Sequence, residues 1–219
     1  MKHLTNKQTS TLKNLDHYIQ DLFKEDKTGH DFGHIKRVVD LTARLLVDKA
    51  NPFVCLVAAY CHDLFDDKLE MPFKSIEELE KISGLDFEGQ KMRIQKVIDE
   101  LGYKGGFDDV SRSLNAQIVY EADLLDASGA IGIGRAFYYA GSKGHIFHDP
   151  SLEGVQASNY DEYRSLSRNV IAHFDEKLLK LKDEMKTDKA KKIANQRHEL
   201  LVMFVKAFKE EVEGRDYEK

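Results

Sequence analysis

The sequence has few cysteines and few prolines, and each shortage narrows the possible classes of protein. Only Cys55 and Cys61 are present, both inside an apolar segment, which predicts reduced core thiols rather than a disulfide framework. No run of about 18 apolar residues could cross a membrane, and the opening "MKHLTNKQTS" lacks the apolar stretch of a signal peptide. We therefore expect a cytoplasmic protein that does not use a membrane.

The sequence also lacks an excess of basic residues. Its 33 lysines and arginines face 38 aspartates and glutamates, a formal net charge of −5. Binding along the backbone of a nucleic acid needs a basic surface, so we do not expect nucleic acid as the main partner. A small phosphorylated substrate remains compatible with this charge.

Strand-like alternation is almost absent, and apolar residues recur instead at helical spacing. This pattern, with three prolines in 219 residues, predicts an all-α protein. Long helices are expected over about residues 7–25, 31–48, 53–62, 87–101, 110–126, 160–184 and 188–212. Ser75 and Glu78 form a capping-box pattern that predicts a short helix beginning after Ser75 and ending near Gly84. The longest irregular stretch is expected over about residues 141–158. No low-complexity linker divides the chain, so we expect one domain.

A histidine–aspartate doublet ends the most apolar of the predicted helices, which we expect to be surrounded by other helices. His62 and Asp63 follow "FVCLVAAYC", where an unpaired carboxylate would be costly to bury. A divalent metal would satisfy an imidazole nitrogen and a carboxylate oxygen at once, with further ligands coming from other helices. The best candidates are His34, near the start of the second predicted helix, and Asp123 in "EADLLDA". Asp126, one turn after Asp123, is expected to be structural.

These residues carry a family resemblance. In their order, His34, the doublet His62-Asp63 and Asp123 resemble the H…HD…D signature of the HD-domain metal-dependent phosphohydrolases. The segments "GHDFGHIKRV", "AAYCHDLFDDK" and "EADLLDASGAIGIGRAF" and the tail from "HFDEKLL" to "MFVKAF" are similar to a bacterial nucleotide (pyro)phosphohydrolase-like subfamily. Where related sequences carry Asp-Ala-Asp-Arg-Leu, this chain has "EADLL" and lacks the arginine.

The resemblance implies an HD-domain helical bundle with a metal site between helices. The single domain, residues 1–219, would have a core over about residues 25–130, and residues 131–219 would form a loop and carboxy-terminal helices packed on the same bundle. One divalent ion would be held by His34, His62, Asp63 and Asp123. Mn²⁺ suits two imidazoles and two carboxylates, with Mg²⁺, Co²⁺, Ni²⁺, Fe²⁺ or Zn²⁺ as alternatives.

Asp66 and Asp67 follow the doublet by three and four residues and would lie on its face if the helix continued. They resemble the acidic pair of the HD proteins that hydrolyse guanosine polyphosphates. Asp66 is expected to orient or deprotonate the attacking water, with Asp67 supporting it. The alternative is that both are solvated acids at a helix end.

Basic residues near the motifs are candidates for contacts with phosphate. They are Lys36, Arg37, Lys68, Arg135 and Lys143. His30 is a candidate substrate contact, with a metal ligand or a helix cap as alternatives. His145 and His148 are expected to contact substrate or belong to a lid; their His-x-x-His spacing leaves a second metal as an alternative.

The function implied is that of a metal-dependent phosphohydrolase acting on a nucleotide. A divalent metal lowers the pKa of a water molecule and withdraws charge from a phosphoryl oxygen. The reaction would be pyrophosphate release from a nucleoside triphosphate or the loss of single phosphates, and the protein could be a homodimer. Alternatives are a metal-binding nucleotide sensor without efficient turnover, a structural metal, and a two-iron oxygenase with extra ligands from His30, or from His145 and His148.

Overall fold

The chain is all-helical, as the sequence predicts. The computed structural model describes residues 4–24, 32–65, 71–101, 111–149 and 169–217. Within these ranges the regular elements are helices, and the β-type contact there is an isolated bridge between Ile146 and Asn169. The described residues form two compact units, one comprising residues up to 101 and 111–123, the other residues from 124 onward. The expectation of a single domain stays a prediction.

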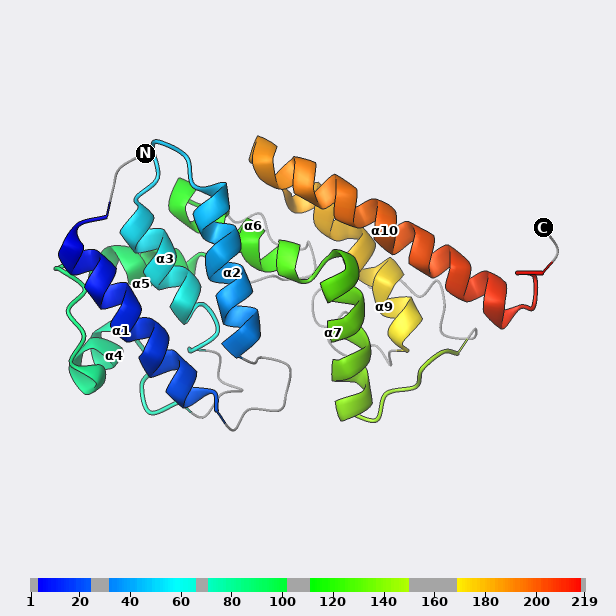
Figure 1. Cartoon of the computed structure of the whole chain (residues 1–219), viewed down its shortest axis with the longest axis horizontal. Coiled ribbons are helices and arrows are strands. Elements are labelled where there is room, and N and C mark those ends of the chain that lie inside the picture. Colours follow the sequence, from blue (N-terminus) through cyan, green and yellow to red (C-terminus); the bar gives the residue numbers. More distant parts are fainter. Residues whose placement is uncertain (1–3, 25–31, 66–70, 102–110, 150–168, 218–219) are drawn as a thin grey trace. The chain divides into compact units, whose positions relative to one another are not determined.

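The first unit surrounds one apolar helix. Its elements are α1 (Asn6–Leu22), α2 (Phe32–Leu45), α3 (Pro52–Cys61), α4 (Ile76–Ser83), α5 (Lys91–Asp99) and the part of α6 (Leu114–Asp126) up to Asp123. Figure 1 shows α3 with α1, α2 and α5 around it, and α3 packs against all three. Eight of its ten residues are buried, because apolar side chains occur on nearly every side of this helix. This confirms the expectation of a surrounded helix.

Local capping signals determine several helix ends. Asn51 accepts a hydrogen bond from the backbone of Val54, and Pro52 occupies the first helical position of α3, where its missing N–H costs nothing. Ser75 caps α4 as predicted, and Gly84 ends that helix in the left-handed conformation. Only half of the expected capping box forms, because the Glu78 carboxylate accepts from the backbone of Lys74 rather than Ser75.

The second unit packs three helical elements against one long helix. The unit contains α7 (Gly129–Ser142), α9 (Val170–Glu176), the 3₁₀ helix η2 (Leu178–Glu184) and the long α10 (Asp188–Val212). The first three each pack against α10, which runs from orange to red in Figure 1. The prediction for residues 188–212 is confirmed, with Thr187 as the cap. No described helix is both long and apolar enough to cross a membrane.

Three predictions about helices were wrong. The helix expected over residues 110–126 begins only at Leu114, after the described non-helical residues 111–113. The expected helix over residues 160–184 is interrupted: α9 ends at Glu176, Lys177 leaves helical geometry at φ −131° and ψ −61°, and a 3₁₀ helix follows; residues 160–168 lie outside the described ranges. The helix expected over residues 87–101 begins only at Lys91, because Glu88 and Gly89 both have positive φ, which a right-handed helix does not accommodate.

Candidate metal centre

Three helices and one turn bring four potential ligands together. His34 is the third residue of α2, and His62 follows the last residue of α3 with helical φ and ψ of −59° and −34°. Asp63 comes next in the turn, and Asp123 lies on α6. All four belong to the first unit.

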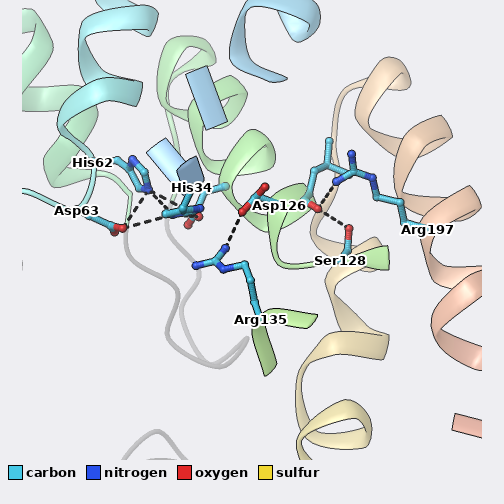
Figure 2. Close-up of polar contacts among 9 residues, drawn as sticks. His34, His62, Asp63, Asp126, Ser128, Arg135 and Arg197 are labelled. Carbon is cyan, nitrogen blue, oxygen red and sulfur yellow. Dashed lines mark hydrogen bonds and ion pairs between the residues drawn. The ribbon is translucent and has the colours of Figure 1, made fainter. Parts of the chain in front are cut away.

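The two imidazoles lie face to edge, and their ring nitrogens nearly touch. The Nε2 atoms of His34 and His62 are 3.1 Å apart, and the ring planes make an angle of 72°. The Oδ2 atom of Asp63 lies 3.3 Å from Nε2 of His34 and 3.4 Å from that of His62. Figure 2 shows these three side chains pointing toward one another.

Asp123 completes the cluster. Its Oδ1 atom lies 3.6 Å from Nε2 of His34 and 3.8 Å from Nε2 of His62. The mutual distances are all within 4.8 Å for the set formed by His34, His62 and Asp123. Asp63 is outside that set but lies closer to both imidazoles than Asp123 does, which makes it a fourth potential ligand.

A backbone carbonyl fixes which nitrogen of His62 is available. Nδ1 of His62 lies 2.8 Å from the carbonyl oxygen of Ala59. A carbonyl oxygen can only accept, so Nδ1 must carry the proton and, in a neutral ring, Nε2 presents a lone pair. Nε2 of His34 faces this lone pair, so it must either carry a proton or bind the same cation as Nε2 of His62. Hydrogen bonding of the second ring nitrogen to a carbonyl is a recurrent feature of metal-ligating histidines.

The donor set fits a divalent cation in chemistry and in spacing. Ligand atoms about 2.1 Å from a shared first-row ion lie about 3.0 Å apart at right angles and about 3.4 Å apart at the tetrahedral angle. The distances from the two imidazole nitrogens to each other and to the carboxylate oxygens run from 3.1 to 3.8 Å. They match these values if the Asp123 side chain moves slightly toward the imidazoles. Two imidazoles and two carboxylates favour a borderline first-row ion over Ca²⁺.

Burial is graded across the cluster. The side chains of His34 and His62 are 1% and 4% exposed, whereas those of Asp63 and Asp123 are 20% and 40% exposed. The imidazoles are therefore held rigidly by the packed helices. The carboxylates form the side of the cluster that solvent reaches.

Comparison with known proteins identifies the family. The model of the HD domain matches residues 31–128, a range that contains all four potential ligands. YpgQ from Bacillus subtilis strain 168 is 34% identical over 208 residues, which cover 92% of this chain and 93% of that protein.

The chain belongs to the HD-domain family.

Solved structures agree with this assignment. A protein from Lactobacillus plantarum superposes with a TM-score of 0.81 at 34% identity, covering 97% of this chain and all of that one. YpgQ in complex with ADP superposes with a TM-score of 0.74 at 30% identity, covering 96% and 99%. An HD-superfamily hydrolase from Bacillus thuringiensis has a TM-score of 0.71 at 29% identity, covering 94% and 98%. The chain thus has the fold of the HD-superfamily hydrolases.

The structure describes only some of the remaining predicted site residues of this HD domain. His30, Asp66, Asp67 and Lys68 lie outside the described residues. Arg37 follows Lys36 on α2 and is partly buried. The predicted roles of these residues stay predictions.

Lys36 is engaged in an ion pair with Asp16, although its side chain is 40% exposed. Its Nζ donates to Oδ1 of Asp16 at 2.6 Å and lies 3.3 Å from the hydroxyl of Tyr60, which also donates to Asp16 at 2.7 Å. Hydrogen bonds from Lys36 and Tyr60 outweigh the opposing effect of burial and lower the pKa of the Asp16 carboxyl. The sequence pattern did not single out Asp16 or Tyr60. The available signal for Asp16 was a carboxylate beside the apolar stripe of the first helix.

In the second unit, Arg135 binds a buried acid. Its Nη1 lies 2.8 Å from Oδ2 of Asp126, whose side chain is 2% exposed, as Figure 2 shows. The expectation that Asp126 is structural agrees with this ion pair. Figure 2 also shows Ser128 and Arg197 converging on one carbonyl group, which is that of Leu125 near the end of α6.

The three other predicted substrate contacts lie at and after the end of α7. Lys143 lies 5.9 Å from the ring centre of Tyr139, and the His145 ring lies 6.1 Å from the same tyrosine. The ring of His148 packs edge-on against Phe208 of α10 at 5.4 Å. Lys143 and His145 are exposed, and their roles as substrate contacts stay predictions.

Proposed function

We propose that this HD-domain protein is a metal-dependent phosphohydrolase that acts on a nucleotide. The observation that carries the proposal is the pair of buried imidazole nitrogens 3.1 Å apart with two carboxylates beside them. The complex of YpgQ with ADP supports a nucleotide as the class of substrate. Within that class, the candidate reactions are release of pyrophosphate from a nucleoside triphosphate and stepwise removal of phosphate.

In this proposal each ligand has a distinct task. His34 and His62 would bind the ion through Nε2, and the contact between Nδ1 of His62 and the Ala59 carbonyl keeps that lone pair directed at the cluster. Asp63 and Asp123 balance the positive charge. A divalent ion held there supplies water of lowered pKa and charge neutralisation for a phosphoryl oxygen. Because Asp123 is the most exposed ligand, we expect the substrate to approach on its side.

The general base is proposed to come from the segment after the doublet. Hydrolysis of a phosphate ester or anhydride needs a group that orients the attacking water and cations that balance the charge spread over the phosphoryl oxygens. Asp66 is assigned the first task, with Asp67 holding it in place. The predicted phosphate contacts from this part of the chain are Lys36, Arg37 and Lys68, and the ion pair of Lys36 with Asp16 argues against Lys36 as one of them.

The test is a hydrolysis screen of the purified chain. Nucleoside mono-, di- and triphosphates would be incubated with Mn²⁺, Mg²⁺, Co²⁺ or Ni²⁺, and the products separated to distinguish pyrophosphate from phosphate. We expect metal-dependent turnover that His62→Ala abolishes. The matched control is His17→Ala, which changes an exposed histidine on α1 and should leave turnover intact.

Two results would contradict the proposal. Metal-loaded protein that is inactive across the panel but binds a nucleotide would identify a sensor instead of an enzyme. Turnover that survives His62→Ala would place the chemistry elsewhere in the chain. Asp66→Asn tests the base separately, since it should keep the metal and lose turnover.

A further inference from the structure

The two helices that carry the histidine ligands are joined a second time, away from the cluster. Oδ1 of Asp16, on α1, accepts from Lys36 of α2 at 2.6 Å and from Tyr60 of α3 at 2.7 Å. Lys36 and the Tyr60 hydroxyl are themselves 3.3 Å apart. One carboxylate of a third helix therefore bridges α2 and α3.

The bridge is placed symmetrically with respect to the ligands. Lys36 comes two residues after His34 on α2, and Tyr60 comes two residues before His62 on α3. Side chains two positions apart on a helix point about 200° apart. The bridging side chains and the ligands thus leave opposite sides of their helices, and each helix is held on both sides.

Such an attachment limits the movements that would separate the two imidazoles. Packing already holds α2 against α3, and a polar contact on the side opposite the ligands further opposes rotation and sliding of the two helices. The distance between the Nε2 atoms is the quantity most sensitive to such movement, because His34 and His62 come from different helices. Their spacing of 3.1 Å depends on the register of α2 against α3.

We propose that Asp16 is a positioning residue of the metal centre, which keeps α2 and α3 in the register that brings the two imidazoles to one ion. The inference rests on the proposed metal site, since it concerns the affinity of that site. Asp16 is not one of the proposed ligands and acts on them through Lys36 and Tyr60. Its partner Lys36 has a structural role in this account, instead of contacting phosphate.

The test compares metal affinity among variants of α1. Asp16→Asn removes the charge that binds Lys36 while the amide oxygen can still accept from Tyr60, and Asp16→Ala removes both contacts. We expect the dissociation constant for Co²⁺, measured by calorimetry, to rise about 3- to 10-fold for Asn and further for Ala, toward the lower part of the range seen for outer ligand partners. The visible absorption spectrum of bound Co²⁺ should shift, because it reports ligand geometry.

Two matched controls on the same helix separate positioning from general stability. Asp21→Asn removes a carboxylate that pairs with Lys24 at 2.6 Å on the exposed surface. Thr11→Ala removes a hydroxyl that donates to the backbone of Asp86 at 3.2 Å and should lower stability while leaving the contacts of Asp16 with Lys36 and Tyr60 in place. Both should keep the wild-type Co²⁺ affinity and spectrum, and Asp16→Glu, which retains the charge, should recover part of the affinity.

The possible failures are distinguishable. Wild-type protein that binds no Co²⁺ would overturn the proposed metal site itself and this inference with it. The inference alone would be overturned if the wild-type protein binds Co²⁺ and the Asp16→Ala variant binds it with the same affinity and spectrum. This holds whether or not the variant is less stable.

Discussion

Replacing Asp123 by asparagine should change the stability of the protein only when metal is present. The Asp123 side chain is 40% exposed, so in the metal-free protein the isosteric change removes a charge that solvent reaches. We expect the free energy of unfolding to change by less than about 0.5 kcal/mol, as for most surface substitutions. With metal, the same change removes one of the proposed ligands.

The size of the metal effect follows from linkage. At a metal concentration 100 times the dissociation constant, binding to the folded state adds about 2.7 kcal/mol. If the variant binds about 100-fold more weakly, the gain at the same concentration falls to about 0.4 kcal/mol. The difference of about 2.3 kcal/mol corresponds to roughly 5–9 °C in Tm for a chain of this size.

The assay is thermal unfolding followed by circular dichroism, with and without Mn²⁺, on wild type, Asp123→Asn and Asp99→Asn. Asp99 is an exposed carboxylate on α5 of the same unit and contacts Gln95, so its variant should keep the full metal-dependent shift. The reasoning is refuted if Asp123→Asn shows the same shift as wild type, because Asp123 would then not be a ligand.

Two further predictions concern the second unit. Gly132→Ala should destabilise the protein by about 2 kcal/mol or more, because an added Cβ would lie 2.3 Å from a backbone oxygen. Gly134→Ala is the control on the same helix, where an added Cβ would have nothing within 4 Å, and it should be neutral or stabilise the protein by up to about 1 kcal/mol. Urea unfolding curves that rank the two variants otherwise would contradict this packing. Burial and, less strongly, the charge of Lys182 lower the pKa of His198 from its usual 6.5, so the unfolded chain takes up the proton at a higher pH than the folded chain. Stability should therefore be lost as the pH falls through about 6.5, and His198→Gln should lose less between about pH 7.5 and 5; an equal loss in both proteins would contradict this assignment.

The helices that the sequence predicts well are those with a clear apolar stripe and a clear end. The buried face of the second helix, the cap at Ser75 and the stop at Gly84 are local features, and the structure has all of them. The convergence of His34, His62 and Asp123 was also predictable, because the order of these residue types matches a known signature.

What the sequence could not show depends on tertiary contacts. The helix α7 was not predicted, because its glycines have a poor helix propensity. One of them, Gly132, fits where a side chain would clash with the preceding turn. The break at Lys177 has no proline or glycine to mark it. The partner of Lys36 could not be predicted, because Asp16 is 20 residues away and no local pattern pairs them.

The most direct test of the central claim is an anomalous difference map from crystals of the Mn²⁺-loaded protein. We predict one peak about 2.1 Å from the Nε2 atoms of His34 and His62, with oxygens of Asp63 and Asp123 as the remaining protein ligands of the same ion. No peak between the two imidazoles, or a second ion bound beside the first, would contradict a phosphohydrolase built on a single metal at this site.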